Sequence, residues 1–170
     1  MTKIAPRPVA GSSTADTARG ELYEADFALW IDRQAALLRS GRIGEVDHGN
    51  LAEELEDMGK RQRQDLRSRL EVLLAHLLKY EFQSGLRMGS WLGTIAEQRA
   101  RIEDLVEESP SLRPVLESLA GEATFYDRAR RQAILETGLP AAKFPHANPY
   151  GARALDRDFW PGEGPHPDLG

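Results

Sequence analysis

One uninterrupted helical pattern dominates the chain, from about Asn50 to Gln83. No proline occurs in this stretch, and large apolar residues recur at steps of three or four, or of seven to eight where a polar residue intervenes. They are Leu51, Leu55, Met58, Leu66, Leu70, Leu73 and Leu77. At about 1.5 Å per residue such a helix is roughly 50 Å long, more than the width of a small domain. We therefore predict that it is the central helix of a bundle, with Leu55, Leu66, Leu70, Leu73 and Leu77 largely buried.

A shorter helical pattern precedes the central helix, from about Tyr23 to Ser40. It has an apolar stripe, and Gly41 follows it at a position that suits a helix C-terminus. The stripe consists of Phe27, Trp30, Ile31, Leu37 and Leu38. The link to the next helix is short, so we expect the two helices to be antiparallel, with Asp47 as the N-cap of the central helix.

Two further helices follow the glycine-containing break at residues 84–89. The third has two candidate starts, because Ser90 could cap it and Thr94 opens a capping-box pattern one turn later. The fourth begins with Ser109 as N-cap and Pro110 at the first helical position, and it runs to Gly138.

The character of the chain changes after Leu139. Four prolines forbid a long regular element, yet the segment is too apolar for a free tail. Its large apolar residues are Phe144, Tyr150, Leu155, Phe159 and Trp160. We predict that residues 139–161 form an ordered, irregular segment that wraps the bundle and buries at least one of its last two aromatic side chains.

Together these patterns predict an all-α fold: an antiparallel bundle of about four helices around one long central helix, with an ordered irregular C-terminal segment. A single helical-bundle domain is expected over residues 21–161. Residues 1–20 are rich in Pro, Gly, Ser, Thr and Ala and are predicted to be a disordered N-terminal tail, and residues 162–170 a loose C-terminus.

Composition narrows the function classes. The 170 residues include 41% hydrophobic ones, which is ordinary for a globular protein. The absence of cysteine excludes disulfides and thiolate chemistry and suits the bacterial cytoplasm. No apolar run has the length of a signal peptide core or a membrane span, so no membrane association is expected. The net charge of −5 argues against nucleic acid as a partner.

Four groups of motifs, in this order along the chain, resemble a known family. They are residues 50–59 (NLAEELEDMG), residues 76–79 (HLLK), residues 91–99 (WLGTIAEQR) with 109–112 (SPSL), and the closing residues 159–161 (FWP). The chain is similar over roughly residues 22–161 to the bacterial domain-of-unknown-function family number twenty-nine. The resemblance implies an all-helical fold. It implies no activity, cofactor or catalytic residue, because none is established for that family.

Polar side chains interrupt the apolar stripes of three predicted helices. The residues most suited to a ligand site are Arg69, His76, Arg99, Tyr126 and Arg130. One interpretation is a guanidinium-rich pocket between helices that binds a small anion. The other is a closed hydrogen-bond network that fixes how the helices pack. Which of the two holds depends on whether these side chains line an open cavity.

A cluster of carboxylates early in the central helix raises the question of a metal. It consists of Glu53, Glu54, Glu56 and Asp57. Dinuclear metal bundles use Glu-x-x-His within single helices, and none of the predicted helices contains this motif. Within one helix His76 is about 30 Å from Glu54 by rise alone, so they cannot share an ion. We expect no metal and no cofactor.

Two functional hypotheses remain. The favoured one is a non-enzymatic helical module that binds a protein partner or a second copy of the chain. The alternative is a binder of a small anionic ligand, or an enzyme, that uses the polar interior around the five residues named above.

Overall fold

The computed structural model describes residues 21–87 and 89–162. The expected tail at 1–20 and most of the expected loose end at 162–170 therefore lie outside the described residues. Within the described ranges every regular element is helical and no strand occurs, so the predicted all-α bundle is confirmed. The chain divides into two compact units, Met1–Lys60 and Arg61–Gly170. The single domain expected over residues 21–161 stays a prediction.

The long helix is α3, His48–Phe82, with 35 residues. It begins where Asp47 Oδ1 accepts a hydrogen bond from the backbone N–H of Asn50 (3.3 Å), which is the capping role expected of this aspartate. Its first residues belong to the first compact unit and the rest, from Arg61 on, to the second.

The second half of α3 confirms the expected burial and the first half does not. Leu66, Leu70, Leu73 and Leu77 are almost fully buried. The prediction for Leu55 is wrong, because this side chain is 61% exposed, as is that of Met58. Tyr23 and Trp30 donate hydrogen bonds to Glu54 and Asp47, so the preceding segment packs on the side of α3 that carries these acids. Leu55 is one residue further on and points about 100° away from Glu54.

The first unit has a small core of its own. It contains α2, Phe27–Arg39, the 3₁₀ turn η1, Ile43–Glu45, and the start of α3. The buried apolar side chains are Trp30, Leu37 and Val46. Gln34 Oε1 accepts a hydrogen bond from the backbone N–H of Asp47 (2.9 Å), which ties the helix to the connection that follows it.

The ends of α2 follow from its flanking residues. Residues 21–25 are also helical, but Asp26 separates them from α2 and caps it by accepting a hydrogen bond from the N–H of Leu29 (3.0 Å). The predicted first helix from Tyr23 is therefore two pieces. Gly41 has φ +72° just after the helix, in agreement with its expected role.

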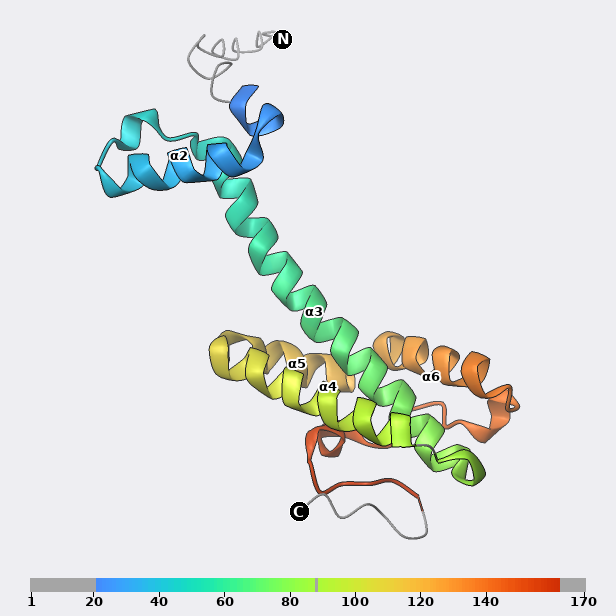
Figure 1. Ribbon diagram of the computed structural model, residues 1–170. Coiled ribbons are helices and arrows are strands. Elements are labelled where there is room, and N and C mark those ends of the chain that lie inside the picture. The colour runs from blue at the N-terminus through green and yellow to red at the C-terminus, as the bar shows by residue number, and fades with distance from the viewer. Residues whose placement is uncertain (1–20, 88, 163–170) are drawn as a thin grey trace, which may run out of the picture. The chain divides into compact units, whose positions relative to one another are not determined.

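The second unit gathers the rest of α3 with three further helices (Figure 1). They are α4, Gly89–Glu108, α5, Arg113–Gly121, and α6, Ala123–Thr137. Because α4 begins at Gly89, the start near Ser90 is correct and the one at Thr94 is not.

The predicted single fourth helix is wrong. A 3₁₀ turn, η3, occupies Pro110–Leu112, and the helical path then breaks at Glu122, which has an extended ψ of 114°. Gly121, a poor helix former, ends α5 and permits this break. Gly138, with φ +66°, ends α6 as expected.

The C-terminal segment (residues 139–161) is ordered and irregular, as predicted. It contains two 3₁₀ turns, η4, Ala141–Lys143, and η5, Gly151–Leu155. Phe144, Tyr150 and Trp160 are buried in the same core as the leucines of α3. The ring of Trp160 lies 5.3 Å from that of Tyr80, and Phe144 lies edge-on to Phe82 at 5.4 Å. The C-terminal segment is therefore part of the core of the second unit.

Replacement of Leu73 by Ala tests this core. Leu73 is fully buried in it, so Leu73→Ala should lower the free energy of unfolding by about 2–5 kcal/mol, as measured by urea denaturation. Leu135→Ala is the matched control, because Leu135 on α6 is 83% exposed and its truncation should change the stability by less than about 0.5 kcal/mol. Equal effects of the two substitutions would contradict the assignment of the core.

Candidate functional site

Arg99, one of the two predicted site residues that are almost fully buried, binds the C-terminal segment. Its guanidinium donates hydrogen bonds to the backbone oxygens of Ala154 (2.8 Å), Phe159 (2.7 Å) and, more weakly, Arg157 (3.4 Å). The same group lies over the ring of Trp160, 5.2 Å from its centroid. Burial lowers the pKa of Arg99, and the nearby Asp156 opposes this. Since the ordinary pKa is 12.5, the group stays a cation at neutral pH.

Tyr126 and Arg130 on α6 act in the same way on an earlier part of the segment. The Tyr126 hydroxyl donates to the backbone oxygen of Pro145 (2.9 Å), and burial raises the pKa of this hydroxyl to about 12, so it remains a donor. Arg130 donates to the backbone oxygens of Ala141 (2.7 Å) and Phe144 (3.2 Å). Three of the five predicted residues thus hold the C-terminal segment by its main chain.

The other two residues bond locally along α3. Arg69 pairs with Asp65 one turn earlier on the same helix (3.0 Å). His76 Nδ1 lies 2.9 Å from the backbone oxygen of Val72, so Nδ1 carries the proton and donates it. Its Nε2 then accepts a hydrogen bond from Lys79 Nζ (3.4 Å). Burial lowers the pKa of His76, and the Lys79 charge adds to this.

Lys79 is a buried polar residue that the sequence analysis missed. Its side chain pairs with Glu136 on α6 (Nζ–Oε2 2.5 Å) and lies over the ring of Trp91 at 4.9 Å. Burial alone would raise the pKa of Glu136, but the hydrogen bonds from Lys79 and Gln132 outweigh it and lower the pKa. The sequence did contain a signal for Lys79, because this residue lies three positions after His76 on the same face of the helix.

The structure does contain a cavity, but four of the five predicted residues do not line it. The cavity has a volume of about 430 Å³, is partly open to solvent, and lies between α4, α5 and η5. Its apolar lining consists of Ile102, Val106, Leu116 and Leu155, and its charged lining of Arg99, Glu103, Glu107, Arg113, Asp156 and Arg157. Sequence reasoning found Arg99 and missed Arg113, a single exposed arginine at the start of α5.

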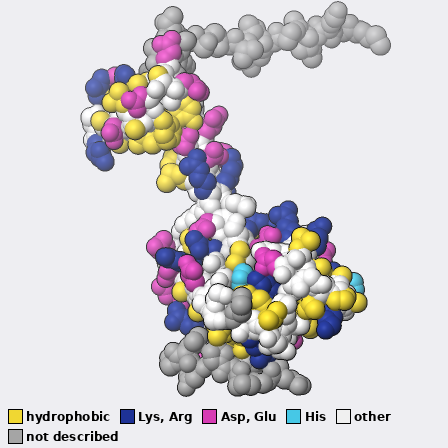
Figure 2. Space-filling view, turned by 45° about the vertical axis from the view of Figure 1, so that its right-hand side comes forward, with side chains coloured by type: hydrophobic (Ala, Val, Ile, Leu, Met, Phe, Trp, Pro, Cys, Tyr) yellow, Lys and Arg dark blue, Asp and Glu magenta, His cyan; other side chains and the backbone are white. Residues whose placement is uncertain are grey.

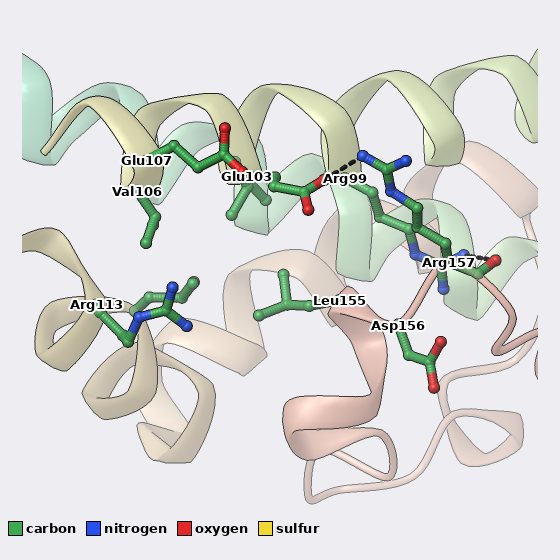
Figure 3. A pocket seen from close by; sticks show the side chains of 10 residues that line it. Arg99, Glu103, Val106, Glu107, Arg113, Leu155, Asp156 and Arg157 are labelled. Atoms are coloured by element: carbon green, nitrogen blue, oxygen red, sulfur yellow. Dashed lines mark hydrogen bonds and ion pairs between the residues drawn. The ribbon is translucent and has the colours of Figure 1, made fainter. Parts of the chain in front are cut away.

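Figure 3 shows how the charged side chains lie in this cavity. Arg157 forms an ion pair with Glu103 at one end. Arg113 extends from α5 toward Leu155 at the other end, with Val106 beside it. Apolar and ionic groups therefore face the same space, an arrangement typical of small-molecule sites.

The first unit exposes an unusual amount of apolar surface. Of the nine large hydrophobic side chains that are exposed in the described part of the chain, seven lie between residues 27 and 58. They are Phe27, Leu29, Ile31, Leu38, Ile43, Leu55 and Met58. Figure 2 shows hydrophobic side chains gathered on one face of this unit, with both acidic and basic groups around them. We call these seven residues the exposed apolar set.

The acidic cluster of α3 makes hydrogen bonds and ion pairs with neighbouring side chains. Over residues 21–87 and 89–162 no group of three or more His, Asp or Glu side chains is placed to hold an ion. Glu54 instead accepts a hydrogen bond from Tyr23 (2.7 Å), which raises the pKa of the tyrosine to about 12. Asp57 pairs with Lys60 (2.8 Å). In the same ranges, no helix combines the length and the apolar character that crossing a membrane requires.

The fold and its bound C-terminal segment define an all-α protein whose polar interior serves mainly to secure its own chain. Residues 22–160 match the family model described as "Domain of unknown function DUF29". The match covers most of the chain, so the protein belongs to this family, as the motifs indicated. No curated protein and no solved structure matches it.

Replacement of Arg99 by Lys should loosen the C-terminal segment. Lysine keeps the charge but lacks the planar group that reaches several carbonyl oxygens, so amide hydrogen exchange over residues 151–160 should accelerate. The free energy of unfolding should fall by about 1–3 kcal/mol. Arg101→Lys, at an exposed position of the same helix, is the control and should change neither quantity. Unaltered exchange in Arg99→Lys would contradict the role assigned to this arginine.

His76 should contribute a pH dependence to stability. Its pKa in the folded protein is below the ordinary 6.5, so between these two values the unfolded chain binds the proton more readily. The contribution of His76 to the free energy of unfolding is complete above pH 6.5 and is lost as the pH falls through the pKa of the folded state. The free energy of unfolding, measured by denaturation at several pH values between 7 and 5, should depend less on pH in His76→Gln than in the parent protein. His48→Gln, at an exposed position, should keep the parent slope; the same slope in all three would refute the expectation.

Proposed function

We propose that this protein is a non-enzymatic interaction module whose first unit binds a basic, amphipathic helix of a partner protein. The observation that carries this proposal is the concentration of the exposed apolar set in residues 27–58. Exposed apolar residues scattered singly are ordinary, but a group of them on one small unit is typical of an interaction surface.

The spacing of these residues supports a helix-facing surface. Phe27, Ile31 and Leu38 fall within about 40° of one another around the axis of α2, beside the face that buries Trp30 and Leu37. Leu55 and Met58 are neighbours on α3, three residues apart. Apolar rows of this kind accommodate the apolar face of another helix.

The charge of the unit supports a basic partner over a second copy of the chain. Residues 21–60 contain ten acidic and four basic residues. Two such surfaces repel each other, whereas lysine and arginine on a partner helix would be attracted and would speed association. The proposal places the protein in the cytoplasm, which suits a chain without cysteine.

The occupied interior supports a non-enzymatic role. Arg99, Tyr126 and Arg130 hold backbone oxygens, and His76 has both ring nitrogens engaged. Groups held in this way are poorly placed to exchange protons with a substrate.

Site-specific photocrosslinking tests the proposal. A photoreactive phenylalanine analogue at Ile31, in living cells of the source species, should capture a different protein through a segment with helical apolar spacing and an excess of Lys and Arg. The same analogue at Leu135, an exposed apolar position on α6, is the matched control and should capture nothing at comparable yield. Capture of a second copy of the chain, of an acidic segment, or of nothing at Ile31 would overturn the proposal.

The captured segment, made as a peptide, then allows a quantitative check. Ile31→Glu should weaken its binding about tenfold or more in fluorescence anisotropy, because it places a charge in an apolar contact. Leu135→Glu should bind like the parent protein. The affinity should also fall as the salt concentration rises, since opposite charges attract the peptide.

A further inference from the structure

We propose that the cavity between α4, α5 and η5 binds a small organic monocarboxylate with an apolar body, its carboxylate on Arg113. This site lies in the second unit and is independent of the surface proposed above. Its volume of about 430 Å³ is within the range of small-molecule pockets and accommodates an acid of about eight carbons.

Arg113 is the cation of this cavity that is left to bind a ligand. Arg99 donates its hydrogen bonds to the C-terminal segment, and Arg157 is paired with Glu103. Within the described ranges the guanidinium of Arg113 has no hydrogen-bond or ion-pair partner, and it extends into the cavity (Figure 3). A guanidinium binds a carboxylate through two parallel hydrogen bonds, which makes it the natural anchor for such a group.

The stability of α5 does not explain why an arginine occupies position 113. It is the first residue of α5, where the positive end of the helix dipole disfavours a cation. A bound carboxylate would offset this repulsion and would itself be favoured by the helix end. The residue is therefore better suited to a ligand than to the helix that carries it.

The walls of the cavity specify the rest of the ligand. Ile102, Val106 and Leu116 are buried and Leu155 is half-buried, and together they form an apolar lining next to Arg113. An alkyl or aryl group placed against these side chains would leave water, which favours binding in proportion to its apolar area.

The acidic residues of the lining exclude a second negative group. Glu103, Glu107 and Asp156 face the same cavity, and only Glu103 among them has an arginine in an ion pair. A ligand with a second carboxylate at its far end would meet these acids without a free cation. The cavity should therefore prefer a monocarboxylate to a dicarboxylate of the same length.

Three compounds of equal chain length test this specificity. Octanoate, octanedioate and octylammonium would be titrated into the full-length protein and followed by two-dimensional NMR and calorimetry. Octanoate should bind at least about tenfold more tightly than either of the others and should shift the amide signals of residues 102–116 and 155–157. Equal binding of octylammonium, equal binding of octanedioate, or no octanoate binding at millimolar concentration would overturn the proposal.

Substitutions then locate the bound acid. Arg113→Gln should weaken octanoate binding about tenfold or more, because a charge-assisted hydrogen bond is lost. Arg101→Gln, an exposed arginine of α4 that does not line the cavity, should leave it unchanged. Leu155→Trp should block binding by filling the cavity, and thermal melting would establish that each variant is folded. Octanoate binding that survives both Arg113→Gln and Leu155→Trp in folded variants would place the acid elsewhere and refute the assignment.

Discussion

The hydrogen bonds from Arg99 to the C-terminal segment are the interaction on which the second unit depends. A buried cation is costly unless it is hydrogen-bonded, and here the carbonyl oxygens of residues 154, 157 and 159 accept one hydrogen bond from each of the three guanidinium nitrogens. This geometry holds η5 and the residues that follow it up to Phe159, and it seats Trp160 under the guanidinium and beside Tyr80. The core leucines of α3 are covered because this segment stays in place.

A second buried cation, Lys79, joins other parts of the same unit. It connects α3 to α6 through Glu136 and lies on the ring of Trp91 from α4. His76 is neutral, and its Nε2 accepts a hydrogen bond from the ammonium group of Lys79. No described side-chain polar atom that is buried lacks a partner, so the polar interior is a complete network that selects one packing of the helices.

Periodicity predicted much of this fold because burial on one face of a helix leaves a regular trace. The extent of α3, the burial of Leu66 to Leu77 and the inward position of Arg99 all follow from it. It failed for Leu55, because an apolar stripe does not say which side of the helix the preceding segment will cover, and here that segment packs on the side of Asp47 and Glu54. The partners of Arg99 and Arg130 were also hidden, because they are backbone oxygens, which every residue possesses. Arg113 left no periodic signal, because the role proposed for it rests on the lack of a partner for its side chain, which only the structure shows.

The main-chain acceptors of the C-terminal segment have an evolutionary consequence. Arg99, Tyr126 and Arg130 contact carbonyl oxygens rather than the side chains of the residues that carry them. Substitutions at exposed receiving positions, such as Ala141 and Arg157, leave these hydrogen bonds intact. Selection on this attachment therefore acts on the three donors and on the few buried aromatic rings. The surface of the segment away from the cavity can drift, and related proteins can acquire different outer faces there without losing the fold.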